Sequence, residues 1–426
     1  MPTTDTVVSV LVMAYNHARF VAQALDSVLR QRTVFPVEII VSEDCSTDGT
    51  LEIVQEYARQ HPHVRLMLSP ANLNTNRVMS RAIEAATGRY VALLDGDDYW
   101  TADDKLQAQI DVLESAPDMS VCFHDAIIVD DEGSVLKERY LPPAMARLTG
   151  LDDIVTGNYV PSCSIVFRRD AIATLPQWFE RASFGDWPLL ILAAMRGSLG
   201  CIDRPMGAYR RHQGGVWSGL SDTGKIREII NFLCYLEESL GPSFSAKVRQ
   251  ARAGWRVHLF DFLALRGDYD VLDTEIAGAV RSGDVAYART SGRTLSQTPA
   301  VPDARARISV VFETGAPLFE EDGILGGHID EVRTTPDGKT LFVRGWARMN
   351  DADRCPVIVV DPGAQMADAT IVRLPRPDVA AAVDPALTQS GLWLRLSSHT
   401  ALREPMRLST AIGDGRYRSI GVVRAT

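Results

Sequence analysis

The chain has 426 residues, a length that predicts two or three domains rather than one compact core. Its hydrophobic content of 46% and charged content of 23% are typical of a soluble globular protein. The net charge of −10 disfavours nucleic acid as a partner, because polyanion binding usually requires a basic surface. The six cysteines form no CxxC pair, which disfavours a zinc site or a disulfide framework and suits a reducing cytoplasm.

The first residues lack the basic segment of a signal peptide, and no stretch approaches the roughly 20 apolar residues that span a bilayer. This pattern predicts a cytoplasmic protein and excludes a transmembrane synthase that extrudes its own polymer. Work at the inner face of the cytoplasmic membrane, by peripheral association, stays open.

The first hundred residues alternate between apolar runs and amphipathic segments. We expect strands at 7–13, 37–41 and 64–68, with helices from about 20, from about 50 and up to 87. Such alternation predicts a parallel sheet covered by helices on both faces. No GxGxxG or GxxxxGK[ST] motif is present, which disfavours a dinucleotide fold or a P-loop.

The segment YVALLDGDDYW at 90–100 carries the strongest chemical signal. An apolar strand ends in Asp95, Asp97 and Asp98, at the edge where open α/β sheets bind their ligands. Crowded carboxylates repel one another, and Mg²⁺ commonly takes one or two of them together with substrate phosphates. The alternative is that Asp97 and Asp98 lead into a helix beginning near Thr101, whose positive end favours acids.

Four motifs in order resemble the family 2 glycosyltransferases of the GT-A fold, in particular bacterial members whose metal motif reads GDDYW: VSVLVMAYNHARF, VEIIVSEDCSTDGT, ANLNTNR and RYVALLDGDDYWTADDKLQAQI. The resemblance covers about the first 220 residues. It implies a metal ion, Mn²⁺ or Mg²⁺, on Asp97 in the manner of a DXD motif. It also implies a nucleotide-sugar pocket that contains Ala14, Tyr15, Glu43, Asp44, Asp95 and Gly96.

The second motif departs from the usual DDGS of this family, because it reads Glu43, Asp44, Cys45, Ser46. A uracil-type base is still the expectation. Tyr15 has an alternative role as a turn aromatic packed on the sheet. Arg77 either reaches a phosphate or the base, or is an exposed arginine at a helix start.

Asp186 follows Gly185 and opens a strongly apolar helix over 187–195. The resemblance implies that Asp186 is the catalytic base, which takes the proton from an acceptor hydroxyl in an inverting displacement. The alternative is an N-cap, because Asp accepts backbone N–H bonds well at that position and Pro188 suits the first turn. Both roles can hold at once.

The segment MGAYRRHQGGVWSG at 206–219 ends an apolar run with cations and a glycine-rich turn. Cations on a loop can hold a departing diphosphate and close over it. The family's YRxH segment resembles Tyr209 to His212, which implies that His212 contacts the metal or the diphosphate with Arg211 as an auxiliary. A structural role for His212 is the alternative.

Three regions are expected: the catalytic GT-A domain at 1–220, a helical region and connector at 221–320, and a small all-β sandwich at 321–426. Within the second region, a helix stops at Gly267, another starts after Asp268, and further short helices are expected between 281 and 316. The helices could pack on the catalytic domain, bind the acceptor or form a homodimer face.

The function that we expect is a metal-dependent, inverting transfer of a sugar from a UDP- or dTDP-sugar to a hydroxyl of a glycan, lipid-linked or protein acceptor, in bacterial surface polysaccharide synthesis. One alternative is a nucleotidyltransferase, although AYNHARF is neither glycine-rich nor basic enough for a phosphate loop. The other is a non-catalytic glycan-binding or scaffold protein that retains the fold.

Overall fold

The computed structural model describes residues 7–142, 147–172, 174–212, 214–215, 217, 219–240, 242–266 and 268–284, and beyond them only strands. Contacts divide the chain into two compact units, 1–248 and 249–426. The predicted domain boundaries near 220 and 320 stay predictions.

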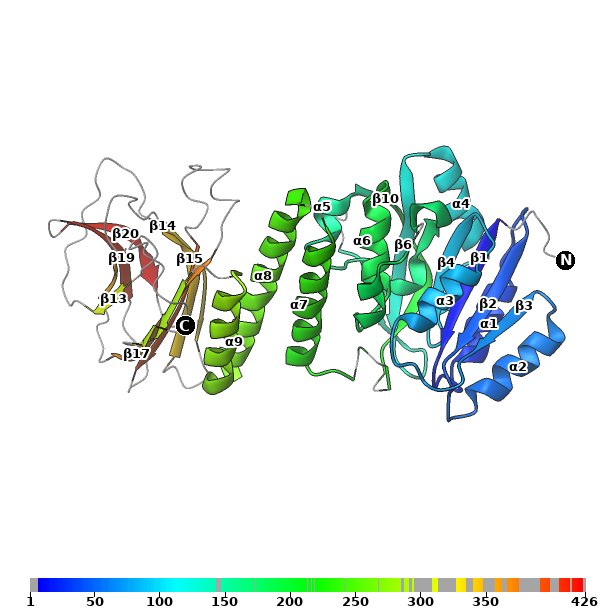
Figure 1. Ribbon diagram of the computed structural model, residues 1–426, viewed down its shortest axis with the longest axis horizontal. Helices are drawn as coiled ribbons and strands as arrows, with labels where there is room; N and C mark the ends of the chain where they lie inside the picture. Colours follow the sequence, from blue (N-terminus) through cyan, green and yellow to red (C-terminus); the bar gives the residue numbers. More distant parts are fainter. Residues whose placement is uncertain are drawn as a thin grey trace. The chain divides into compact units, whose positions relative to one another are not determined.

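Strand and helix alternate through the first unit, as the sequence pattern predicts (Figure 1). The apolar runs become four strands: β1 (Val8–Ala14), β2 (Val37–Glu43), β3 (Val64–Leu68) and β4 (Tyr90–Asp95). They are parallel to one another in the order β3-β2-β1-β4. The helices between them are α1 (Val21–Leu29), α2 (Thr50–Gln60) and α3 (Arg77–Ala85).

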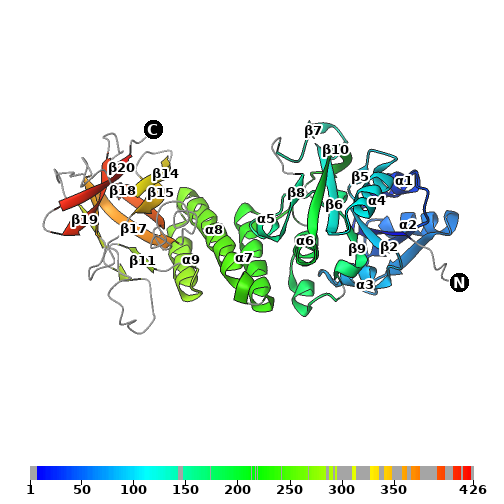
Figure 2. The ribbon, with the colours of Figure 1, turned by 90° about the horizontal axis from the view of Figure 1, so that it is seen from above.

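The core of this unit lies between the sheet and three helices. Alternate β1 residues Val8, Val10 and Val12 face side chains of α1, α2 and α4 (Lys105–Ser115). The helices α3 and α6 (Asp186–Ala194) contact strands of the same sheet and lie on its other face (Figure 2). Both faces are therefore covered, so ligands reach the sheet at the ends of its strands.

Beyond the first hundred residues, for which the parallel arrangement is confirmed, the sheet is mixed. The order continues β4-β9-β6-β10-β5, and the short β9 (Val166–Arg168) runs antiparallel to β4 and to β6 (Met119–Val129). The chain enters it from a single 3-10 turn, η1 (Ser162–Ser164). Elsewhere, β10 (Ser198–Arg210) is parallel to β6, while β7 (Val135–Lys137) and β8 (Leu148–Thr149) lie at the margins.

The helix expected to begin near Thr101 begins at Lys105 instead. Tyr99–Trp100 form the two-residue strand β5, which pairs antiparallel with β10. This pairing keeps the chain extended directly after the acids. The interpretation of Asp97 and Asp98 as residues that lead directly into a helix near Thr101 is therefore wrong.

The helical region is confirmed as α7 (Asp222–Ser239), α8 (Pro242–Arg266) and α9 (Tyr269–Arg281). The expected short helices after 281 are wrong for the described residues, where the segment contributes β11 (Tyr287–Thr290), β12 (Arg293–Thr294) and β13 (Ser309–Phe312). These strands pair with later ones, β11 with β17 and β13 with β16. Long-range pairing of this kind leaves no local period in the sequence.

The C-terminal segment is all-β in its described parts. The predicted hairpin is present as β14 (Gly327–Thr334) and β15 (Thr340–Ala347), while its turn lies outside the described residues. The later strands are β16 (Val357–Asp361), β17 (Met366–Leu374), β18 (Gly391–Ser398), β19 (Met406–Gly413) and β20 (Arg416–Val423). They form two sheets, β12-β11-β17-β18-β15-β14 and β13-β16-β19-β20.

Candidate active site

The carboxyl ends of β1, β2 and β4 bring three of the predicted site residues to one edge of the sheet. Ala14 is in register with Glu43, and Met13 is in register with Asp95. The loops that follow these strands meet there. Thr47 N donates to Asn16 Oδ1 at 2.8 Å, and Gly96 N donates to Met13 O at 2.7 Å.

Asp95 lies among other acids. Burial raises the pKa of Asp95 to about 7, and the charges of Asp97 and Asp186 add to this effect, while a hydrogen bond from Ser162 opposes it. The structure thus brings Asp95 and Asp97, from the loop after β4, within electrostatic reach of Asp186 from α6.

Asp97 lies between two histidines. Its Oδ2 is 2.9 Å from His212 Nε2 and 3.7 Å from His17 Nε2. Burial alone would raise the pKa of Asp97, but the His212 hydrogen bond and the two imidazoles hold it below its ordinary value. The same hydrogen bond raises the pKa of His212, whereas burial lowers that of His17. Asp97 is therefore held ionised.

Gly96 allows this close arrangement. A Cβ at residue 96 would lie 2.7 Å from His17 Nδ1 and 3.0 Å from Met13 O, which is closer than side-chain carbons approach such atoms. A side chain there would displace His17 from Asp97. The role of Gly96 in contacting the nucleotide sugar stays a prediction.

Arg210 holds the loop that follows β4 in place through hydrogen bonds. Its backbone N–H donates to the buried Asp98 carboxylate at 2.8 Å, and its side chain donates to Asp97 O at 2.9 Å and to Gln23 Oε1 at 2.8 Å. Two further bonds reach the carbonyl oxygens of Asp130 and Asp131. Asp98 thus has a structural partner, and Arg210 fixes the backbone that presents Asp97.

Asp186 is the first residue of α6, and its N-cap is Gly185, so the N-cap interpretation of Asp186 is wrong. Its Oδ2 accepts a hydrogen bond of 2.8 Å from Asn158 Nδ2. Burial raises the pKa of Asp186. The next residue anchors the helix, because buried Trp187 donates to Ile154 O at 2.7 Å and packs 5.3 Å from the Phe232 ring.

The two acids at the carboxyl end of β2 each accept backbone hydrogen bonds from a loop. Glu43 accepts backbone N–H bonds from Cys45 at 3.1 Å and Ser46 at 2.7 Å. Asp44 accepts from Leu73 N at 3.1 Å. Their predicted contact with the base stays a prediction.

The remaining predicted residues are more accessible. Tyr15 is half-buried, whereas Arg77, at the start of α3, and Arg211 are exposed. Among the described residues, the side chains of Arg77 and Arg211 make no hydrogen bond or ion pair with the acids. Their roles as auxiliary cations stay predictions.

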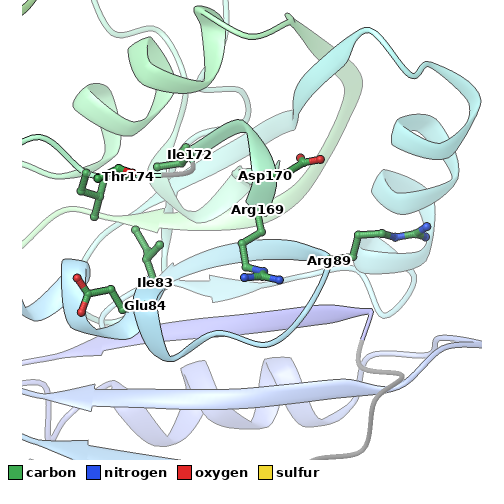
Figure 3. Close-up of a pocket in the computed structure, with 8 residues that line it drawn as sticks. Ile83, Glu84, Arg89, Arg169, Asp170, Ile172 and Thr174 are labelled. Carbon is green, nitrogen blue, oxygen red and sulfur yellow. The ribbon is translucent and has the colours of Figure 1, made fainter.

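A cavity of about 610 Å³ lies at the opposite edge of the sheet (Figure 3). Arg89, which precedes β4, and Arg169, which follows β9, line it together with Ile83 and Asp170. None of the predicted site residues lines this cavity. It is therefore separate from the cluster of acids.

Sequence reasoning missed His17, Arg210, Asn158 and Ser162. His17 could have been found, because the loops that follow two adjacent parallel strands meet at one edge. Arg210 could have been separated from Arg211 by the alternation of β10, whose inward residues include buried Met206 and Ala208.

Two absences bear on the chemistry. In the part of the chain that the structure describes, no helix is long and apolar enough to cross a membrane. Within the same residues, no group of three or more His, Cys, Asp or Glu side chains is placed to hold a metal ion by itself.

Comparison with known proteins finds a family model and several relatives that part of this chain matches. Residues 9–175 match the family model described as Glycosyl transferase family 2. An uncharacterized protein of Mycobacterium tuberculosis is 34% identical over 224 residues, which are 52% of this chain and 63% of that protein. An uncharacterized glycosyltransferase of Nostoc is 26% identical over 213 residues, 48% of this chain and 65% of the relative.

A putative teichuronic acid biosynthesis glycosyltransferase, TuaG of Bacillus subtilis, is 36% identical over 113 residues. The match covers 26% of this chain and 44% of TuaG. The chain thus spans less than two thirds of the length of these curated relatives.

Proposed function

We propose that this chain, whose residues 9–175 match the family model described as Glycosyl transferase family 2, is a glycosyltransferase of that family with a GT-A domain in its N-terminal region, and that it moves a sugar from a nucleotide-diphosphate donor to an acceptor hydroxyl. The observation that carries the proposal is that Asp95 ends β4 at the carboxyl edge of the parallel strands, where the charges of Asp97, in the next loop, and of Asp186, at the start of α6, both act on it. The diphosphate of the donor needs a cation to stabilise its charge, and the acceptor hydroxyl needs a base to take its proton. This cluster offers a residue for each role.

The donor's diphosphate calls for a divalent cation, and the groups around Asp97 fit one. A carboxylate oxygen and an imidazole nitrogen, Asp97 Oδ2 and His212 Nε2, lie 2.9 Å apart beside His17. Mn²⁺ accepts both donor types, and Mg²⁺ accepts a carboxylate with phosphate oxygens and water. Asp97 and His212 are the residues that would hold the ion. When bound, the ion would stabilise the negative charge that grows on the leaving diphosphate.

Asp186 is the proposed base. Its carboxylate is held by Asn158, and burial raises its pKa, so it is a stronger base when ionised than an exposed aspartate. It would take the acceptor proton as the hydroxyl attacks the anomeric carbon and the bond to the diphosphate breaks. One such displacement inverts the configuration at that carbon.

The base pocket is proposed at the loops after β1 and β2. Ala14 and Tyr15 would flank a uracil or thymine ring, and Glu43 or Asp44 would accept its imide N–H. Both acids are buried and already order the loops around them, which favours a preformed pocket. Arg77 and Arg211 would approach the phosphates from exposed positions.

The acceptor is proposed as a glycan, a lipid-linked glycan or a protein in bacterial surface polysaccharide synthesis. The name of the Bacillus subtilis relative, a putative teichuronic acid biosynthesis glycosyltransferase, supports this class of product. The proposed place of work is the cytoplasm, with peripheral access to the inner face of the membrane for lipid-linked acceptors.

A thermal-shift panel tests the proposal. The full chain is heated with UDP, dTDP, GDP and ADP, each with and without Mn²⁺, and the panel is repeated with Asp97→Asn as the matched control. We expect at least one nucleotide to raise the melting temperature only with the metal and only in the wild type. The corresponding nucleotide sugar should then be hydrolysed slowly. No shift with any nucleotide and no hydrolysis of any donor would contradict the proposal.

A further inference from the structure

Asn76 joins two segments that flank the proposed active site. Its side-chain Nδ2 lies 3.0 Å from Phe179 O, 2.9 Å from Ala182 O and 2.8 Å from Phe184 O. Two N–H groups thus serve three carbonyl oxygens that span the approach to α6. Only the nitrogen of the amide can face these oxygens, because the amide oxygen would repel all three.

This use of Asn76 is unusual for its position. Asn76 is the N-cap residue of α3, where an asparagine normally accepts a bond from its own helix, yet its side chain makes no cap bond. The amide is directed instead to a segment about a hundred residues later in the chain. Its contribution is therefore to tertiary positioning rather than to the helix that it begins.

The other end of the same loop is held by the proposed base pocket. Asp44 accepts the N–H groups of Leu73 at 3.1 Å and of Asn74 at 3.4 Å. Asn74 has a φ of 46°, which a turn residue without β-branching tolerates. The segment 73–76 is thus fixed at one end to Asp44 and at the other to the residues before Asp186.

Close packing leaves the segment before Asp186 little freedom. A Cβ at Gly185 would lie 2.6 Å from Met79 Sδ and 3.2 Å from Asn76 Oδ1, so α3 abuts the backbone of residue 185. Phe179 and Ala182 are buried, with exposed fractions of 0% and 4%. The carbonyls that Asn76 satisfies lie around the short 3-10 helix η3 (Gln177–Arg181), where regular helix bonding does not continue.

We propose that Asn76 is a positioning residue that couples the loop on Asp44 to the segment that places Asp186. The proposal rests on the proposed function for the role of Asp186, whereas the mechanical link stands on the hydrogen bonds alone. Ordering of the 73–76 loop by a nucleotide is then transmitted to the backbone of 179–186. In this way, binding of the donor would fix the position of Asp186.

The test compares Asn76→Ala and Asn76→Asp with Asn72→Ala in the full chain. Asn72 is the matched control, because its side chain accepts a bond from Asn74 N within the same loop and does not reach 179–184. Hydrogen exchange of the amides at 179–187 is measured with and without UDP and Mn²⁺. Steady-state kinetics then separate kcat from the donor KM.

In the wild type and in Asn72→Ala, we expect the nucleotide to slow exchange at 179–187. In both Asn76 variants, exchange should be faster without nucleotide and should no longer respond to it, while UDP affinity stays within about threefold. Misplacement of a catalytic group by about 1 Å can cost about 100-fold, so we expect kcat to fall at least about tenfold with little change in donor KM.

Wild-type exchange at 179–187 in both Asn76 variants would overturn the coupling, whatever the kinetics show. A fall in kcat with unchanged exchange would also overturn it. If UDP does not bind the wild type, the proposed function fails, and exchange without nucleotide still decides the role of Asn76. If Asn76→Asp does not fold, because its charge faces three carbonyls, Asn76→Ala carries the test.

Discussion

Lys105 offers a sharp test of the packing beneath the active site. The first residue of α4 is fully buried, and its Nζ has no hydrogen-bond partner among the described residues. The ammonium lies 3.9 Å from the centroid of the Trp100 ring, with the thiols of Cys122 and Cys163 near enough to act electrostatically. Replacing Lys105 by Met keeps the length of the side chain and removes the charge.

Burial lowers the pKa of Lys105 from 10.5 to about 7. At about 1.4 kcal/mol per pH unit, this difference corresponds to an upper bound of about 5 kcal/mol of lost stability. The pKa of Lys105 is lower in the folded state than in the unfolded state. The loss of folding stability is therefore complete below pH 7, becomes smaller as the pH rises, and vanishes above pH 10.5. A methionine cannot make the contact of the cation with Trp100, which reduces the gain below the upper bound. We therefore expect Lys105→Met to raise the free energy of unfolding by about 2 kcal/mol at pH 7.

The assay is urea unfolding of the full chain at pH 7, 8 and 9, followed by tryptophan fluorescence. The difference in the free energy of unfolding between Lys105→Met and the wild type should decrease as the pH rises, by roughly 1.4 kcal/mol per pH unit at most. Lys137→Met is the control, because Lys137 is exposed on β7. A Lys105→Met protein that is less stable than the wild type at pH 7, or a difference that is independent of pH, would refute the reasoning.

Three further outcomes follow from the site. Asp97→Ala should abolish turnover and weaken Mn²⁺-dependent UDP binding about tenfold or more in calorimetry, and near-normal activity in added Mn²⁺ would sink the metal assignment. UDP or dTDP should bind more tightly than GDP or ADP, because the pocket rejects bases that leave Glu43 or Asp44 unpaired; equal affinities would contradict it. Arg210→Met should lower the free energy of unfolding in urea by about 3 kcal/mol, because three carbonyl oxygens and Gln23 Oε1 lose their hydrogen-bond donor. An unchanged urea midpoint would argue against a structural role for Arg210.

The strands and the cluster of acids were predictable because local pattern and topology agree there. The apolar runs that become β1 and β4 are buried on both faces, so their composition alone marks them as strands. Parallel strands end at one edge, which places Ala14, Glu43 and Asp95 together without further information. The approach of Asp186 follows from the family resemblance rather than from spacing.

The rest depends on contacts that leave no local signal. The alternation of β10 separates inward Arg210 from exposed Arg211, but the bonds of Arg210 to Asp97 O and Gln23 Oε1 join segments far apart in the sequence. The side chain of Asn76 turns away from its helix to carbonyls a hundred residues later. Whether Asp186 caps α6 or begins it is a difference of one residue, which depends on backbone angles rather than on side-chain chemistry.

The central claim, that this site transfers a sugar with Asp186 as base, is tested most directly by Asp186→Asn. The amide oxygen of Asn can accept the same bond from Asn158, and Gly185 remains the N-cap, so the fold and the binding of UDP with Mn²⁺ should be unchanged. An amide cannot take the acceptor proton, and turnover of donor and acceptor should fall about 100-fold or more. Turnover close to the wild-type rate, with binding intact, would contradict the claim and place the base elsewhere.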